Sequence, residues 1–380
     1  MTPILALWLA LAAPALPPAF AEPEVTGAAR TAFDWRRERC AAWDAPDGPA
    51  RAWRGPDGVG LLISSPASRL SLGPDLDRLA HDCAVAYQGA RDDDPGAHDD
   101  RVWIAGPHPL PDGRTVALAH AEYHGDKRPG ACAAGTYAAC WRNSVTELVS
   151  EDGGRTFRRA GVVAALPYPY HPDQSRRTGY FNPSNIVERD GWLYAFVFAE
   201  ATGAQARGPC LIRRPVAGGP GDWRAWDGEA FAAAFADAYA APPPADPGAH
   251  VCAPLPGLSS TVSSVVWSEA AGRWLAVTPA ALGDAAGVRR SGIWWTASDD
   301  LIRWDRPRLL IERPLLWRRN CAAEAAWAYP SLIDPSSPAA DFGAADDDFR
   351  LYLVRMPLGP DCRVGPERDL VWFPVSWRRP

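Results

Sequence analysis

One short phrase recurs five times along this chain: a polar or small start, a run of alternating apolar positions, a turn and a second apolar run. Such a phrase is typical of a β-hairpin, because alternation places every second side chain on one face of a strand. The copies begin at Asp47, Asp99, Asn182, Ser263 and Tyr329. Their starts lie roughly 50 to 80 residues apart, enough for a four-stranded sheet and its connections. The pattern predicts an all-β fold, a five-bladed β-propeller of four-stranded antiparallel blades around a central channel.

We expect the blades at about 44–90, 96–168, 178–235, 257–315 and 326–377, in a single domain over residues 22–380. Hydrophobic residues make up 47% of the 380 residues, which is sufficient for a large core. The segment from Phe33 to Trp43 is expected to be an outer strand that closes the ring against the last blade and so covers an exposed edge. A ring of this kind gathers the starts of its innermost strands at one mouth of the channel.

The first 21 residues have the pattern of a signal peptide. An apolar run extends from Ile4 to Ala13, and Ala19, Phe20 and Ala21 form the small-x-small pattern of a cleavage site. We therefore expect cleavage near Ala21 and a secreted or periplasmic protein. No later stretch is as long and apolar as a membrane helix, so no membrane partner is expected.

Eight cysteines follow the predicted signal peptide, and none of them forms a CxxC pair. An even number of cysteines in an exported protein favours disulfides over a zinc site. Cys132 and Cys140 flank the short segment CAAGTYAAC, so this bridge is the most strongly indicated. The other pairs are assigned because each falls within or beside one blade, although spacing leaves other pairings open. They are Cys40 with Cys83, Cys210 with Cys252 and Cys321 with Cys362.

The formal net charge of the chain is -6, and its sequence pI is about 5.7. A protein that binds nucleic acid as its main partner needs clustered positive charge to contact phosphates. The composition therefore argues against a nucleic-acid partner, and we expect a monomer.

The segment Ser150 to Phe157, SEDGGRTF, fits the pattern S-x-D-x-G-x-T-aromatic. This is the Asp box, a turn between the two outer strands of many propeller blades. Ser and Asp side chains in it bond local backbone N–H groups, and its glycines permit positive φ. A degenerate copy runs from Ser298 to Trp304. Both turns indicate the fold and say nothing of the chemistry.

Several phrases resemble the five-bladed propeller glycosidases that include arabinanases, β-xylosidases and fructosidases. They are NPSNIVERDGWLYAFVF, YPSLIDP and SDDLIRW, together with the five-blade spacing. The segments HAEYHGD, CWRNSVTELVSEDGG and GYFNPSNIV are also similar to a group of secreted propeller proteins without an assigned activity. The resemblance implies a channel-mouth site with three carboxylates: a base or nucleophile, a proton donor and a third that tunes the pKa of the donor.

Cleavage of a glycosidic bond needs one ionised and one protonated carboxyl group. The catalytic candidates at the expected mouth are Asp47, Asp100, Glu122 and Glu200. Asp47 opens the first hairpin, with Asp44 as a competitor. Glu122 ends the second hairpin, where alternation places His120 and His124 on the same face of the strand. The two imidazoles can steer the proton of Glu122 or hold a sugar hydroxyl.

A second set of residues near the expected mouth suits contacts with sugar rings and hydroxyl groups. These candidates are Arg51, Asp99, Trp103, His120, Tyr123, His124, Asn182, Ser184 and Tyr329. Each also has an ordinary structural explanation as a rim, turn or core residue. The group of His120, Glu122 and His124 is alternatively suited to zinc or calcium. We assign no metal or cofactor to the site and leave a structural calcium in the channel open.

These patterns predict a secreted glycoside hydrolase-like protein that cleaves a polysaccharide or oligosaccharide with paired carboxylates at the channel mouth. A carbohydrate-binding propeller without catalysis is the main alternative, because Asp47-Gly48-Pro49 stretches the family's Asp-Pro opening and Asn182 stands where relatives often have Asp. The Asp box also suggests a sialidase-type enzyme, to whose arginine triad Arg51 and Arg69 are possible contributors. Sialidases usually have six blades, which disfavours that alternative.

Overall fold

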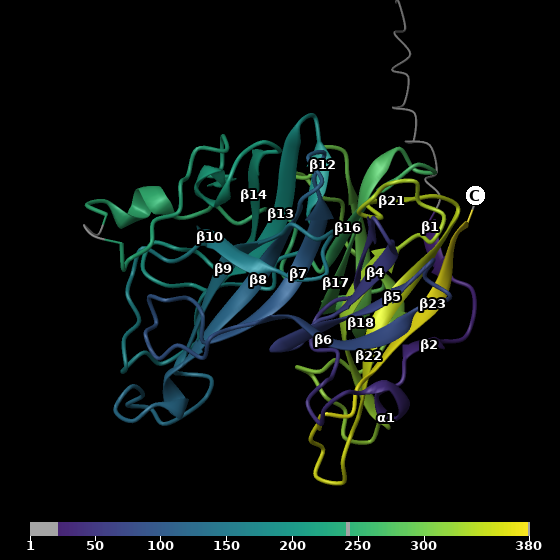
Figure 1. The fold of residues 1–380 in the computed structure, drawn as a ribbon, viewed down its shortest axis with the longest axis horizontal. Coiled ribbons are helices and arrows are strands. Elements are labelled where there is room, and N and C mark those ends of the chain that lie inside the picture. The colour runs from purple at the N-terminus through teal and green to yellow at the C-terminus, as the bar shows by residue number, and fades with distance from the viewer. Residues whose placement is uncertain (1–21, 241–243, 379–380) are drawn as a thin grey trace, which may run out of the picture.

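The computed structural model describes residues 22–240 and 244–378, and these form 23 β-strands with one α-helix of a single turn (Figure 1). The strands group into five successive antiparallel meanders, which we number one to five along the chain. The predicted signal peptide lies outside the described residues.

Each meander has four strands that pair in order. Meander one contains β3 (Arg51–Gly55), β4 (Gly58–Ile63), β5 (Ala67–Gly73) and β6 (Ala80–Gln88). Meander two contains β7 (Arg101–Pro109), β8 (Thr115–His124), β9 (Trp141–Ser150) and β10 (Arg158–Ala164). Meander three contains β12 (Val187–Arg189), β13 (Trp192–Ala199), β14 (Gly208–Pro215) and β15 (Arg224–Ala225). Meander four contains β16 (Ser264–Ser268), β17 (Arg273–Gly283), β18 (Arg289–Ser298) and β19 (Arg308–Glu312). Meander five contains β20 (Ala325–Ile333), β22 (Asp348–Pro357), β23 (Asp369–Arg378) and, from the start of the chain, β1 (Glu22–Val25).

The remaining elements connect the meanders. They are β2 (Arg30–Phe33), β11 (Thr178–Phe181), β21 (Ala344–Ala345), α1 (Trp35–Glu38) and the 3-10 helices η1 (Gly125–Lys127), η2 (Pro220–Asp222) and η3 (Pro247–His250). Strand β11 pairs with both β9 and β13, which joins meanders two and three into the teal sheet of Figure 1. Strand β21 pairs with β16 and links a loop of meander five to meander four.

The expectation for residues 33 to 43 is wrong in its position. Both β1 and β2 pair with β23, so the closing strands end at Phe33, and the segment after it contains α1. Asp34 caps this helix: its Oδ1 accepts from the N–H of Arg36, and its own N–H donates to Glu38. A side chain that bonds the backbone in this way favours a helix start over a continuing strand.

Five hydrophobic clusters make up the core, and each one lies between two meanders. Meanders one and two share the cluster around Trp53 and Ile104, and two and three share the cluster around Val145 and Tyr180. The remaining clusters join three with four, four with five, and five with one. The packing therefore links the five meanders in a closed cycle, which keeps every sheet covered on both faces.

Arg51 lies where four meanders meet. Its guanidinium donates to the carbonyls of Ala50, Ala105 and Ser263 and to Oγ of Ser331, which belong to or adjoin meanders one, two, four and five. The side chain is buried, and burial lowers the pKa of Arg51 to about 9. This one residue holds together segments that are far apart in the sequence.

All four predicted disulfides are present: Cys40–Cys83, Cys132–Cys140, Cys210–Cys252 and Cys321–Cys362. The turn from Ser150 to Phe157 connects β9 to β10, as expected. In it, Oδ1 of Asp152 accepts from the N–H groups of Arg155 and Thr156. Among the described residues, no helix has the length and apolar character needed to cross a membrane.

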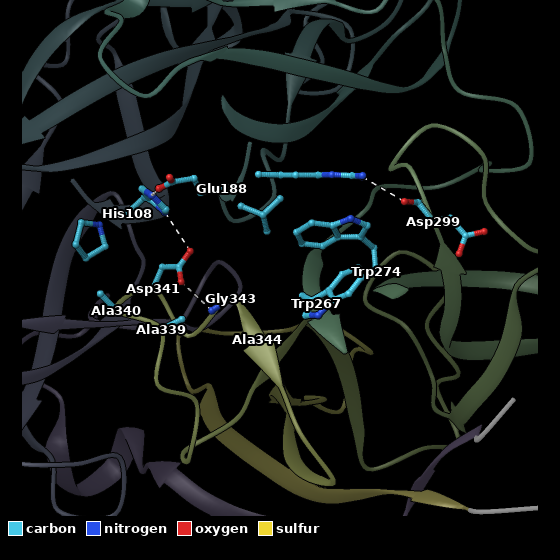
Figure 2. Close-up of a pocket in the computed structure, with 13 residues that line it drawn as sticks. His108, Glu188, Trp267, Trp274, Asp299, Ala339, Ala340, Asp341, Gly343 and Ala344 are labelled. Carbon is cyan, nitrogen blue, oxygen red and sulfur yellow. Dashed lines mark hydrogen bonds and ion pairs between the residues drawn. The ribbon is translucent and has the colours of Figure 1, made fainter. Parts of the chain in front are cut away.

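Different side chains gather at the two ends of the meanders, that is, where their first strands begin and where these strands end. One end contains the predicted carboxylates Asp47 and Glu122. The other end, which we call the far end, contains His108 and surrounds a cavity of about 560 Å³ (Figure 2).

Candidate functional site

The candidate site lies at the end of the meanders where β7 begins and β8 ends. We call it the mouth site and define it by three carboxylates, Asp47, Glu122 and Glu200, and two phenols, Tyr137 and Tyr329. The carboxylates come from the first, second and third hairpins of the chain.

Glu122 is the most enclosed acid of the mouth site, with 8% of its surface exposed. Its Oε2 lies 2.7 Å from Nε2 of His124, and its Oε1 lies 3.7 Å from Nδ1 of His120. All three side chains point from one face of β8, which confirms the alternation expected from the sequence. Burial lowers the pKa of His120, and its Nε2 lies 2.7 Å from Oδ1 of Asn143. The neutral form of this imidazole is therefore favoured beside the acid.

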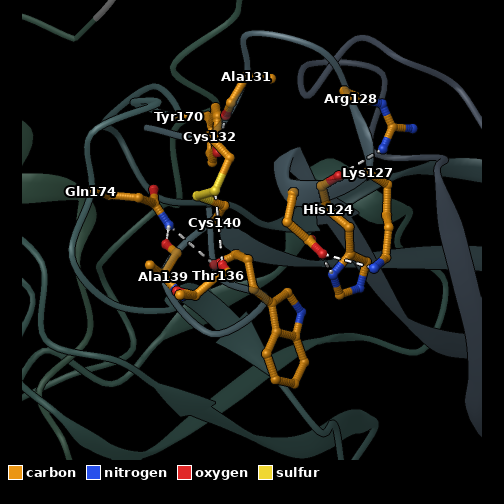
Figure 3. The surroundings of a disulfide bond; sticks show 12 residues. His124, Lys127, Arg128, Ala131, Cys132, Thr136, Ala139, Cys140, Tyr170 and Gln174 are labelled. Atoms are coloured by element: carbon orange, nitrogen blue, oxygen red, sulfur yellow. Dashed lines mark hydrogen bonds and ion pairs between the residues drawn. A yellow bond between two sulfur atoms is a disulfide. The ribbon is translucent and has the colours of Figure 1, made fainter. Parts of the chain in front are cut away.

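A short loop places Tyr137 over this cluster. The ring of Tyr137 stacks on that of His124, with centroids 4.7 Å apart, and 44% of its surface remains exposed. The Cys132–Cys140 disulfide closes the loop, and Figure 3 shows the groups that hold it in place. Oη of Tyr170 donates to the carbonyl of Ala131, and Nε2 of Gln174 donates to that of Ala139.

Asp47 contacts Tyr329, one of the two phenols of the mouth site. Its Oδ1 accepts a hydrogen bond of 2.9 Å from Oη of Tyr329 and pairs with Arg368. Burial, reinforced by the charges of Asp47 and Glu122, raises the pKa of both Tyr137 and Tyr329. The charges of Asp47 and Glu122 therefore both influence the two phenols of the mouth site.

Two residues at this end have strained backbones. Tyr329 and Asn182 have φ values of 58° and 50°, and each precedes a proline in a matching P-S phrase. Positive φ is uncommon for side chains of this size, and such strain tends to occur at functional sites. The repeated sequence phrase thus produces the same unusual backbone in two parts of the molecule.

Glu200 lies at the end of β13 and is held by two arginines. Its Oε1 lies 3.1 Å from Nε of Arg177, and its Oε2 lies 3.1 Å from Nε of Arg207. The guanidinium of Arg177 also covers the rings of Trp141 and Phe181, at 4.6 and 4.0 Å. Because Trp141 stacks on His124, Arg177 connects Glu200 to the group around Glu122.

Five buried polar atoms around Glu122 have no hydrogen-bond partner among the described residues. They are Nε of Arg101, Nε1 of Trp103, Nδ1 of His124, Oδ1 of Asp126 and Nε1 of Trp141. Of these, the His124 and Asp126 atoms lie 3.9 Å apart as a long ion pair. Buried polar groups in proteins are nearly always hydrogen-bonded, so such a concentration in one place is a mark of a site that binds polar groups. The predicted residue Trp103 belongs here, since its ring lies 6.1 Å from that of His120.

Asp100, Asp99 and Tyr123 do not join the mouth site. Arg101 is paired with Glu122 across β7 and β8, so Asp100 and Tyr123 fall on the opposite face of the sheet. Oδ2 of Asp100 accepts from Arg128 and from the backbone N–H of His124. Arg128 covers the ring of Tyr123 at 4.7 Å.

Asp99 lies close to a different phenol, since its Oδ1 accepts a hydrogen bond of 3.3 Å from Tyr87. Burial raises the pKa of Asp99. Asp99, Asp100 and Tyr123 line one small cavity together with Glu122, while the hydrogen bonds of the two aspartates go to Tyr87, Arg128 and the backbone of His124. A role for them in the site stays a prediction.

Ser184 and Arg51 are also structural. Oγ of Ser184 donates to the carbonyl of Asn185 and accepts from the N–H of Phe196, and the residue is fully buried. Arg51 is buried, and its guanidinium donates hydrogen bonds to residues of or beside other meanders. Arg69 lies against Asp44 in meander one. These positions leave neither arginine free to grip a substrate carboxylate, which removes the support for a sialidase-type site.

The metal alternatives gain no support from the described residues. Within ranges 22–240 and 244–378, the only three side chains that converge as metal ligands are Cys40, Asp44 and His81, and Cys40 is in a disulfide. The region where the meanders meet contains the guanidinium of Arg51, whose charge would repel a calcium ion. The residues there do not fit a structural calcium.

Three residues of the site were not predicted from the sequence: Tyr137, Arg177 and Arg368. Tyr137 is the only aromatic residue between Cys132 and Cys140, which is a signal that was available. Arg177 and Arg368 lie in irregular segments, and their contacts with Glu200 and Asp47 depend on long-range closure.

No protein-family model matches the chain, and no curated protein matches its sequence. Solved structures do resemble it over most of its length. A glycosyl hydrolase from Bacteroides ovatus has a TM-score of 0.50 at 8% identity, covering 94% of this chain and 95% of that one. An α-L-arabinanase from Cellvibrio cellulosa has a TM-score of 0.47 at 11% identity, covering 86% and 91%. A xylan β-1,4-xylosidase from Bacillus halodurans has a TM-score of 0.49 at 8% identity, covering 90% and 55%. The similarity to the Bacteroides ovatus glycosyl hydrolase is one of fold alone.

Proposed function

We propose that the five meanders are the blades of a five-bladed β-propeller, in one domain over residues 22–380. The support is the closed cycle of hydrophobic clusters, the four strands of every meander and the pairing of the first strands with the last. Closure by strands from both ends of the chain covers the edges that a row of open sheets would expose.

On this fold, the mouth site is that of an exported glycoside hydrolase. The observation that carries this proposal is that two acids from different hairpins lie at the same end of the strands. Asp47 accepts a hydrogen bond from Tyr329, and Glu122 lies 2.7 Å from His124, on whose ring Tyr137 stacks. Two carboxyl groups in different surroundings are the minimum for glycosidic cleavage, because one must be ionised while the other delivers a proton.

The surroundings of each acid suggest its role. Asp47 pairs with Arg368 and accepts a hydrogen bond from Tyr329, which fixes the position of its carboxylate, so it acts as base or nucleophile. Glu122 lies against two imidazoles, which can supply or take up its proton, so it acts as the proton donor. Glu200 fixes Arg177 over the aromatic rings and acts as a positioning residue.

The aromatic side chains of the mouth site suit a carbohydrate. Tyr137 keeps 44% of its surface exposed beside the acids, and the indole N–H groups of Trp103 and Trp141 have no hydrogen-bond partner among the described residues. Sugars combine apolar C–H faces, which stack on such a ring, with hydroxyl groups that accept from such donors. The expected partner is therefore a polysaccharide or oligosaccharide.

A carbohydrate-binding protein without catalysis is the second candidate. It is favoured by the ion pairs of Glu200, because each of its two carboxylate oxygens contacts an arginine. If Glu200 were the proton donor, its protonation would break both ion pairs. A protein in which this protonation does not occur would bind glycans without cleaving them.

Hydrolysis of a panel of arabino-, xylo- and fructo-oligosaccharides by the purified protein distinguishes the two candidates. We expect turnover by the wild type and a loss of about 10² to 10⁴-fold in kcat for Glu122→Gln and for Asp47→Asn. Glu151→Gln, an exposed acid in the turn between β9 and β10, is the matched control and should retain full activity. Equal turnover by the control and by both mouth variants would contradict the assignment. Binding of one of these sugars without turnover would identify the second candidate.

The compartment follows from the disulfides and the predicted signal peptide. Four disulfides and the absence of free cysteines in the described residues indicate an oxidising environment outside the cytoplasm. We propose secretion or periplasmic export after cleavage near Ala21, and a monomeric state.

A further inference from the structure

The cavity at the far end of the strands is separate from the mouth site. Arg101 begins β7 at the mouth and His108 lies seven residues later, which is about 23 Å along an extended strand. The cavity has a volume of about 560 Å³ and is lined by residues of meanders two, three, four and five. Pockets of this size accommodate small organic ligands.

His108 is the unusual group in this cavity. Only 3% of its surface is exposed, and its ring lies between two acids (Figure 2). Nδ1 lies 3.1 Å from Oδ2 of Asp341, and Nε2 lies 3.6 Å from Oε2 of Glu188. Neither nitrogen has a hydrogen bond of good geometry within the described part of the chain. Nδ1 is engaged by the ion pair with Asp341, so Nε2, which lies farther from its acid, is the nitrogen with bonding capacity available to a ligand at the cavity wall.

Two tryptophans form an aromatic wall in the same cavity. Trp267 and Trp274 pack edge to face, with ring centroids 5.4 Å apart and an angle of 71° between them. Nε1 of Trp274 is a second buried donor without a partner among the described residues. Figure 2 shows both rings across the cavity from His108 and Asp341. An apolar wall that faces polar groups suits a ligand with one apolar and one polar side.

The cavity is lined by three acids and one arginine. Glu188, Asp299 and Asp341 would repel an anion such as phosphate. Asp341 already pairs with His108 and Asp299 with Arg273, and Arg189 also lines the cavity, so the lining is a poor match for a simple cation. Donors and acceptors that alternate over a short distance match hydroxyl groups, each of which can donate and accept.

We propose that this cavity, which we call the far-end site, binds a short neutral segment of carbohydrate. The choice of a carbohydrate rests on the proposed function, while the existence of a binding site rests on the cavity itself. A chain held at the far end would keep the protein on a polysaccharide while the mouth site works on another part of it.

The test is the number and location of binding sites on the full-length mature protein. Glu122→Gln protein is titrated with arabinohexaose and with xylohexaose by isothermal titration calorimetry and by protein-observed NMR. We expect two sites per chain for at least one probe. Adding Glu188→Ala or Trp267→Leu should weaken one site about tenfold and leave the other unchanged. Adding Tyr137→Ala should do the reverse.

Two controls keep the outcome clear. Glu188 is an exposed side chain in the short strand β12, so Glu188→Ala should fold even where Trp267→Leu does not. Glu151→Ala is the matched control and should weaken neither site. Probe binding that is insensitive to both far-end substitutions, or no binding of either probe, overturns the far-end site. Absence of turnover by the wild type, with a site that remains sensitive to Glu188→Ala, contradicts the proposed hydrolase and supports the far-end site.

Discussion

At each of its two ends the β7–β8 hairpin contributes an imidazole that lies beside an acid, and the two arrangements differ in how they are bonded. The acid at the mouth belongs to the hairpin itself, whereas the acids at the far end come from β12 and from the loop after β20. At the mouth, Oε2 of Glu122 lies 2.7 Å from Nε2 of His124, and aromatic rings cover the pair. At the far end, His108 lies between two acids without a hydrogen bond of good geometry in the described structure, beside a cavity. A close acid–imidazole pair suits proton transfer, whereas a buried polar group with open bonding capacity suits ligand binding. Similar residue types thus support different chemistry when their packing differs.

The largest effect on stability is expected from Arg51, the residue where four meanders meet. Arg51→Met removes a guanidinium that donates to four acceptors and leaves three buried carbonyls without it. We expect a loss of about 3 kcal/mol in the free energy of unfolding, measured by chemical denaturation. Arg155→Met, which removes only a surface ion pair with Asp57, should cost less than about 1 kcal/mol. An equally small effect of Arg51→Met would mean that the meanders do not depend on a shared centre.

The second prediction sharpens the comparison by loosening only the mouth. The Cys132→Ser/Cys140→Ser variant opens the loop that places Tyr137 over His124. Closing a loop of this length is worth about 2.5 kcal/mol at most in chain entropy, so the fold should survive. We expect about a tenfold loss of turnover at the mouth, while binding at the far end stays unchanged. Unchanged turnover would show that Tyr137 has no part in the site.

The smallest effect concerns the far end and depends on pH. Burial tends to raise the pKa of Asp341, but the contact with His108 and the hydrogen bond from the N–H of Gly343 outweigh burial. The pKa of Asp341 is therefore lowered from 3.8. A lowered pKa in the folded state gives stability that is fully present above the unfolded value and is lost as pH falls through the folded value. Asp341→Asn should therefore remove about 1 kcal/mol at pH 6 and almost nothing near pH 2, as measured by thermal unfolding. A difference of the same size at both pH values would contradict this explanation.

Much of the fold was predictable because it depends on local patterns. The hairpin phrases predicted the position of every meander, and the placement of cysteines within or beside single meanders predicted all four disulfides. The error at residues 33 to 43 came from a local competitor, since the capping of α1 by Asp34 outweighed the apolar residues that suggested a strand.

The mouth site was predictable only in part, for reasons of register and distance. Alternation placed His120, Glu122 and His124 on one face, because that rule holds within a single strand. It did not establish how β7 aligns with β8, and the register that sets Arg101 opposite Glu122 sends Asp100 to the other face. The far-end site could not be predicted from the sequence, because His108 and Asp341 are far apart in the chain and meet only in the folded structure.

The location of a bound sugar tests the central claim most directly. A crystal structure of Glu122→Gln protein, soaked with the oligosaccharide that the wild type turns over, should show it at the mouth between Tyr137 and Tyr329, with a glycosidic oxygen near residue 122. A sugar found elsewhere while that mouth stays empty, at a concentration well above its Kd, would contradict the account.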